Sequence, residues 1–197
     1  MENNLTTAED LKTIRKIMED STKFLSISGI SGLFMGLTAL AGALVAYLLS
    51  ADVRNLDLIM WKLVTDAILV LMMSITIAFY FSLRKAKRAG KSFWTPVSKR
   101  LLLNLFIPLV TGGILAVILM VKSEFLYIIP VFLIFYGLAL INAGKFTYSE
   151  VFYLGILEII TGLVSAIFPS GALFFWIFGF SILHIAYGLF MYRKYEA

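Results

Sequence analysis

The chain has 197 residues, of which 60% are hydrophobic and only 15% are charged, and its mean hydropathy is +0.93. Soluble globular domains are roughly 45–50% apolar, so this composition excludes an ordinary water-soluble domain. The chain contains no cysteine, which excludes disulfides, thiolate catalysis and cysteine-bound metal clusters. The net charge of +5 does not indicate a nucleic-acid partner, because the basic residues flank apolar stretches.

The first 23 residues form a separate, polar-rich segment. Thr6 with Glu9, and Thr7 with Asp10, are two overlapping signals for the start of a helix. Residues then recur at helical spacing on one face, at Leu11, Ile14, Met18, Ser21 and Leu25. We therefore expect an amphipathic helix over residues 1–23. It either lies on the membrane or beneath its own bundle, or it binds a cytoplasmic protein partner.

The remaining residues contain long apolar stretches. About 20 apolar residues in a helix cross the roughly 30 Å hydrocarbon core of a bilayer. The last stretch, from Val151 to Tyr192, is too long for one span, and Pro169-Ser170-Gly171 divides it. We expect an all-α integral membrane protein with one transmembrane domain over residues 24–197. Its six predicted spans are approximately 24–50, 60–83, 101–121, 125–144, 149–168 and 172–192.

The basic residues are distributed unevenly between the two ends of these spans. Of the 17 lysine and arginine residues, 14 fall on the side of the N-terminal segment. The positive-inside rule then places both termini in the cytoplasm of a bacterial-type inner membrane. The densest group follows the second span and is a candidate contact for anionic lipid, unless it serves only to set the orientation: Arg84, Lys85, Lys87 and Arg88.

Parts of the chain resemble one another. Thr111-Gly112-Gly113-Ile114 resembles Thr161-Gly162-Leu163-Val164, and Tyr136-Gly137-Leu138 resembles Tyr187-Gly188-Leu189. We interpret the spans as three helical hairpins derived from one unit. Small residues allow helices to approach closely in lipid. The candidate packing glycines, acting within one chain or between copies in a homo-oligomer, are Gly29, Gly32, Gly36, Gly112, Gly113 and Gly162.

These glycine-rich paired spans, with a proline in a short turn and a Tyr-Gly-Leu stretch near the end, resemble the small six-span HdeD-like membrane proteins. Residues Gly155–Tyr192 carry the resemblance most clearly, followed by Thr111–Ile141 and then Ser28–Ala46. The resemblance implies a role connected with bacterial acid resistance and supplies no catalytic residue. The N-terminal segment and the basic group depart from the compact pattern of that family.

Two ionisable residues are predicted to lie near the middle of the membrane. Glu158 precedes Pro169 by 11 residues and His184 follows Gly171 by 13, so the helical rise places them at similar depth. Adjacent antiparallel helices could bring them together. The pair is either a proton-sensing or proton-transferring site, or a structural hydrogen bond joined by Thr161 or Tyr187.

Asp66 is a second candidate, near the other end of its span. It follows Lys62 by one helical turn, so an ion pair between them is possible. Asp66 is either a solvated acid at the membrane surface or part of a polar vestibule for a ligand or ion.

Enzyme motifs are missing from the sequence. One histidine cannot supply bis-histidine haem ligation or a multi-histidine zinc site, and no Gly-x-Ser-x-Gly or GxxxxGK[ST] motif occurs. We expect no cofactor and no metal. We predict a non-enzymatic membrane protein with a structural, stress-response or regulatory role. The alternative is a small transporter or channel for a proton-coupled or lipid-like solute that uses Glu158, His184 and Asp66.

Overall fold

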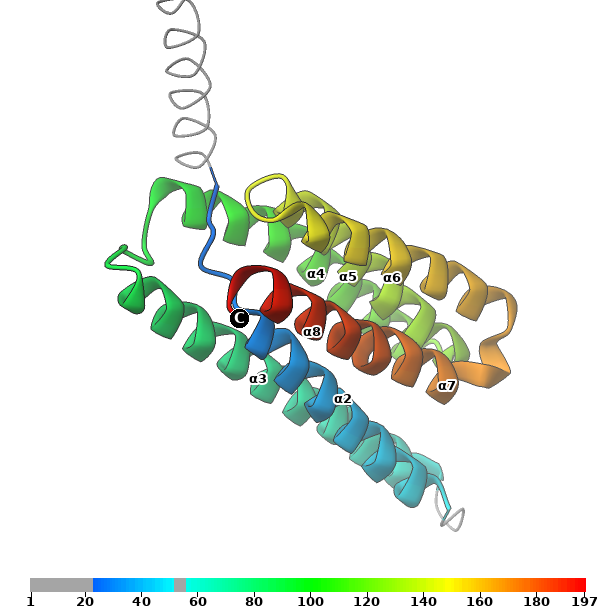
Figure 1. Cartoon of the computed structure of the whole chain (residues 1–197). Helices are drawn as coiled ribbons and strands as arrows, with labels where there is room; N and C mark the ends of the chain where they lie inside the picture. The colour runs from blue at the N-terminus through cyan, green and yellow to red at the C-terminus, as the bar shows by residue number, and fades with distance from the viewer. Residues whose placement is uncertain (1–22, 52–55) are drawn as a thin grey trace, which may run out of the picture.

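The computed structural model describes residues 23–51 and 56–197, and this part of the chain is helical, without strands (Figure 1). Six of its helical segments are long and apolar enough to cross a membrane. The prediction of a six-span all-α membrane protein is therefore confirmed at this level. The amphipathic helix expected over residues 1–23 lies outside the described residues, apart from Lys23.

The six spans are built from the following elements, in chain order. The first three spans are single helices, namely α2 (Gly29–Ser50), α3 (Leu56–Arg88) and α4 (Pro96–Val121). A 3₁₀ turn, η1 (Phe125–Tyr127), leads into α5 (Ile128–Gly144), and α6 (Ser149–Ile167) follows. The last span contains four elements: η2 (Pro169–Gly171), α7 (Ala172–Trp176), the π-helix η3 (Ile177–Leu183) and α8 (His184–Tyr195).

The first span begins later than predicted. Residues 24–28 are not helical, and α2 starts only at Gly29. Side chains from distant parts of the chain bond the backbone of this extended segment: the Thr147 hydroxyl donates to the Phe24 carbonyl at 2.6 Å, and the Tyr148 hydroxyl donates to the Leu25 carbonyl at 2.7 Å. Because these bonds satisfy the backbone, the segment does not need to be helical.

The third span begins earlier than predicted, because its start has a strong local signal. Thr95 and Ser98 form a reciprocal capping box: the Thr95 hydroxyl accepts from the Ser98 amide at 3.1 Å, and the Ser98 hydroxyl accepts from the Thr95 amide at 2.9 Å. Pro96 occupies the first helical position, where its missing N–H costs nothing. The basic residues on both sides of the α3–α4 connection therefore lie on helix ends.

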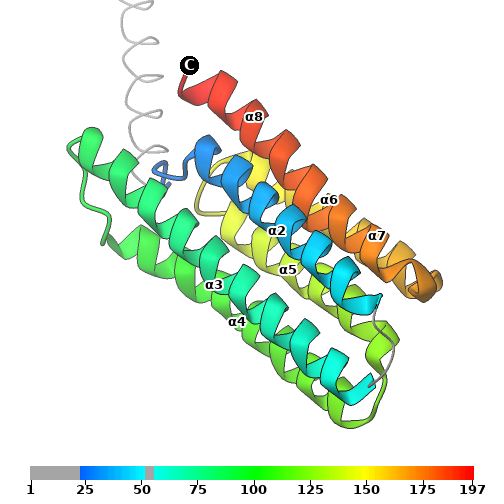
Figure 2. The same ribbon diagram turned by 90° about the horizontal axis from the view of Figure 1, so that it is seen from below.

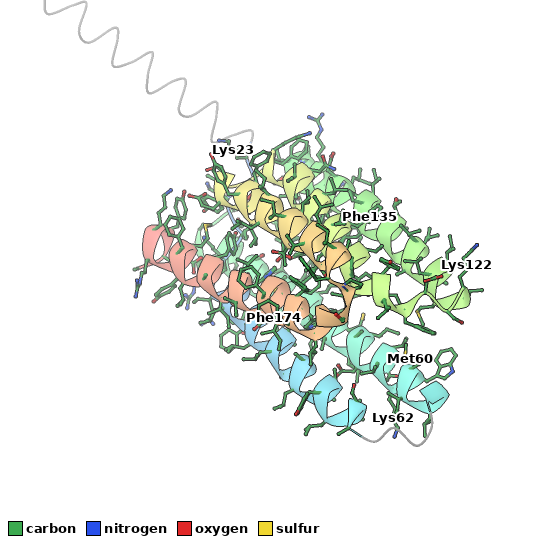
Figure 3. All side chains as sticks on the ribbon, turned by 90° about the vertical axis from the view of Figure 1, so that its right-hand side faces the viewer. Lys23, Met60, Lys62, Lys122, Phe135 and Phe174 are labelled. Carbon is green, nitrogen blue, oxygen red and sulfur yellow. The ribbon has the colours of Figure 1, made fainter. Side chains whose placement is uncertain are left out.

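The helices form two groups joined by the last span. Helices α4, α5 and α6 lie side by side, α2 pairs with α3, and η3 and α8 lie between the two groups against α2 and α6 (Figures 1 and 2). The most extensive contact of α6 is with α5, and that of α8 is with α2. The end that carries Lys23 and the start of α2 is called the basic end below. Lys62 and Lys122 lie at the opposite end (Figure 3).

Two helix crossings in this bundle repeat the same glycine contact. A Cβ atom added to Gly137 of α5 would lie 2.6 Å from the carbonyl oxygen of Gly155 in α6. A Cβ atom added to Gly188 of α8 would lie 2.8 Å from the carbonyl oxygen of Gly29 in α2. In each pair the contact is reciprocal, so the crossing α5–α6 and the crossing α8–α2 share the same close glycine–glycine contact. Only glycine permits such a close approach of two backbones.

Most of the predicted packing glycines do face another helix. Gly29, Gly32 and Gly36 press against α8, while Gly112 and Gly162 press against α5 from opposite sides. Since these faces are covered within the chain, they are not free to bind a second copy. Gly113 faces no other helix in the described part of the chain, since a Cβ atom there would meet nothing within 4 Å. Adjacent residues of a helix point about 100° apart, and here it is Gly112 that faces α5.

Candidate functional site

One face of α6 is lined with small and polar residues. Its buried positions recur every three or four residues and so form one stripe: Val151, Leu154, Gly155, Glu158, Thr161, Gly162 and Ser165. Glu158 is completely buried in this stripe, at 0% exposure. A carboxyl group without contact with water is costly, so its surroundings have to compensate for it.

The structure brings Glu158 and His184 together. Glu158 Oε1 lies 3.4 Å from His184 Nδ1, and His184 is 3% exposed. The equal depth expected from the helical rise is therefore correct. His184 is the only basic side chain that the described part of the chain pairs with Glu158.

His184 has a hydrogen bond on each ring nitrogen. Nε2 lies 2.8 Å from the hydroxyl of Tyr136 in α5, and Nδ1 lies 3.2 Å from the carbonyl oxygen of Gly179. A carbonyl oxygen only accepts, so Nδ1 carries a hydrogen. That hydrogen is directed at Gly179, since the approach of Glu158 to Nδ1 does not form a hydrogen bond. Tyr136, His184 and Glu158, here called the polar triad, thus connect α5, α6 and α8.

A π-helical turn shapes the space around the carboxyl group. Gly179 lies in η3, and a Cβ atom on it would approach Glu158 Oε2 to 2.7 Å and Leu133 even more closely. Glycine at this position therefore makes room for the carboxyl group. π-turns insert one extra residue into a helix and occur often at functional sites. Here the turn directs the Gly179 carbonyl at His184 and the Gly179 Cα at Glu158.

The residues expected to join the pair do not do so. The Thr161 hydroxyl donates to its own backbone at Leu157, at 2.8 Å, and the buried Tyr187 hydroxyl has no hydrogen-bond partner. Tyr136 takes their place, and sequence reasoning missed it. The one available signal was its position in the repeat, where Tyr136 corresponds to Tyr187.

Asp66 is not part of the polar triad. It lies on α3 and faces Gly42 of α2, where a Cβ atom would be 3.5 Å from its carboxylate. In the described residues, no ion pair joins Asp66 to Lys62. Both residues line a shallow, open depression of about 340 Å³ between α2 and α3, together with Val45, Leu49, Trp61, Thr65 and Leu69.

One of the four basic residues predicted to contact lipid is engaged inside the protein. Lys85 Nζ donates to Glu196 Oε1 at 3.0 Å and to the Ile27 carbonyl at 2.8 Å. Glu196 also accepts from the Gly29 amide at 2.7 Å and the Ser28 hydroxyl at 3.0 Å, at the start of α2. Carboxylates are favoured at helix N-termini, so these five residues form a polar clamp at the basic end. Arg84, Lys87 and Arg88 are exposed.

The chain matches no protein-family model, no curated protein sequence and no solved structure. In the described residues, no three His, Asp or Glu side chains come together in the manner of a metal site. The hydrogen bonds of the polar triad can brace α8 and η3 against α5, and its carboxyl group can hold a proton.

Proposed function

We propose that this protein is a non-enzymatic, multi-pass membrane protein with a structural, stress-response or regulatory role, in which His184 of the polar triad braces α8 and η3 against α5 while Glu158 of α6 is buried beside it. The observation that carries this proposal is the complete burial of Glu158 beside His184, whose two ring nitrogens are bonded to two other elements. A side chain that binds a substrate must be accessible to that substrate, whereas a side chain that only holds helices together can be fully buried.

The proposal includes the orientation of the protein in its membrane and its contacts with lipid. The basic end faces the cytoplasm of a bacterial-type inner membrane, with both termini inside, because the lysine and arginine residues collect there. The repeated crossings α5–α6 and α8–α2 support descent of the three hairpins from one unit, and the glycine-rich paired spans keep the resemblance to the HdeD-like proteins as part of the proposal. Arg84, Lys87 and Arg88 contact anionic lipid headgroups, since they are exposed on the last turns of α3.

The partners that we propose are a cytoplasmic protein and further copies of the chain. The N-terminal segment docks on a cytoplasmic protein, and no nucleic acid is bound. A homo-oligomer would use a surface other than the glycine faces of α2, α5 and α8, because these are covered within the chain.

The second candidate function is a small proton-coupled or lipid-like solute transporter. The observation that favours it is the pair of Glu158 carboxyl oxygens, both buried without a hydrogen-bond donor beside a π-turn. Burying a carboxyl group without hydrogen bonds lowers the stability of the protein, and a purely structural brace would not require such a group.

Native mass spectrometry of the gently extracted protein tests both functions, with wild type compared to Glu158→Gln and to the control Glu150→Gln. Glu150 is on the same helix but is paired with Lys194 at its end. If all three proteins carry the same species, the brace is supported. A small molecule or lipid that is lost only in Glu158→Gln would contradict it and favour transport.

A further inference from the structure

The polar triad also constrains where one proton resides. Glu158 and His184 are buried together, and the described part of the chain places no lysine, arginine or second carboxylate beside them. In the described residues the other titratable group that contacts the pair is Tyr136 from α5, while Tyr187 of α8 packs against Leu140, Val151 and Leu154. A net charge in such a place is very unfavourable, so the pair is neutral as a unit.

A neutral pair can be arranged in two ways. Either Glu158 is ionised and His184 is a cation, or Glu158 is a protonated carboxylic acid and His184 is neutral. An ion pair of this kind is stable when the carboxylate receives hydrogen bonds that replace water. The Glu158 carboxyl group receives none, since both of its oxygens lack a hydrogen-bond donor.

The bonds of His184 are satisfied in the second arrangement without any charge on the ring. The Nδ1–H group donates to the Gly179 carbonyl, and Nε2 can then accept from the Tyr136 hydroxyl. A neutral imidazole protonated on Nδ1 satisfies both contacts at once. The hydrogen on Nδ1 also points to the carbonyl oxygen 3.2 Å away rather than to the carboxyl group 3.4 Å away.

We propose that Glu158 is a proton-binding site that carries its proton in the state described here, with His184 held neutral between Tyr136 and Gly179. Loss of that proton to water would leave a carboxylate beside Nδ1–H, which would then compete with the Gly179 carbonyl for the same hydrogen. Proton occupancy of Glu158 is thereby coupled to the π-turn. This inference deepens the proposed function, because it concerns the same three side chains.

Infrared spectroscopy of the protein in lipid vesicles at neutral pH tests the proposal. The protein is labelled with ¹³C on the glutamate side-chain carboxyl carbon, so that glutamate bands are distinguished from those of Asp66. We expect one carbonyl band of a protonated glutamic acid in wild type. The band is lost in Glu158→Gln and kept in Glu150→Gln, since Glu150 accepts from Lys194 and Tyr195 and is ionised.

Nitrogen NMR of ¹⁵N-labelled histidine provides the second measurement and needs no variant, so a misfolded Glu158→Gln would not leave the question open. His184 is the single histidine of the chain, so its signals are assigned without ambiguity. A neutral ring protonated on Nδ1 is expected. An imidazolium signal, or the absence of the acid band in wild type, would overturn the proton site. Neither result would remove the brace, because His184 would still bond to Tyr136 of α5 and to Gly179 of η3.

Discussion

At the scale of single residues, the polar triad depends on a tyrosine hydroxyl. Tyr136 is half-buried on α5, and its hydroxyl is the only group that the structure places on Nε2 of His184. The phenyl ring also lies against the imidazole, with 5.4 Å between the ring centroids. The hydroxyl can therefore be removed while the packing of the ring is retained.

Tyr136→Phe tests the contribution of this bond to stability. We expect the free energy of unfolding to fall by about 1–2 kcal/mol, because Nε2 of a buried ring is left without its partner. Unfolding in detergent–lipid mixtures, followed by helical circular dichroism, measures the change. Tyr153→Phe is the matched control, since Tyr153 lies on α6 and is 63% exposed. An equal effect of both substitutions would show that the hydrogen bond to His184 contributes nothing.

At the scale of helices, the two repeated crossings depend on single glycines. Gly188→Ala would place a methyl group 2.8 Å from the Gly29 carbonyl and still closer to the Leu33 amide. The contact atoms belong to the backbone and cannot rotate away, so α8 and α2 have to separate. We expect a loss of about 1–3 kcal/mol in the free energy of unfolding.

Gly113→Ala is the control for that experiment. The added methyl group would meet nothing within 4 Å, so the gain in helix propensity is the only expected effect. We predict unchanged or slightly higher stability in the same unfolding assay. If Gly113→Ala lowered the free energy of unfolding as much as Gly188→Ala, alanine would be destabilising at any glycine of these helices, whatever atoms surround it.

The polar clamp at the basic end joins the start of α2, the end of α3 and the end of α8. Glu196→Gln keeps the size of the side chain but removes the charge that Lys85 and the α2 N-terminus stabilise. We expect the free energy of unfolding to fall by about 1–2 kcal/mol, which lowers the midpoint of the unfolding curve. Glu124→Gln, at an exposed position at the opposite end, is expected to leave the midpoint unchanged.

For the molecule as a whole, the sequence predicts what depends on local composition. Six spans and the equal depth of Glu158 and His184 follow from hydropathy and helical rise alone. The rotation of each helix does not follow from them, and for that reason Tyr136 was missed and Gly113 could not be told apart from Gly112, which alone faces α5. The extended segment at residues 24–28 was also missed, since its stability comes from Thr147 and Tyr148, more than 100 residues away.

Orientation in the membrane can be measured directly because the chain lacks cysteine, so one introduced cysteine is unique. Ser92 and Ser170 are exposed in connections at opposite ends of the bundle. We expect a membrane-impermeant maleimide to label Ser170→Cys in intact cells and Ser92→Cys only after the membrane is opened. The reason is that Ser92 lies among the basic residues that the positive-inside rule retains in the cytoplasm. The reverse pattern would place both termini outside, and equal labelling of both variants in intact cells would mean that the chain inserts in two orientations.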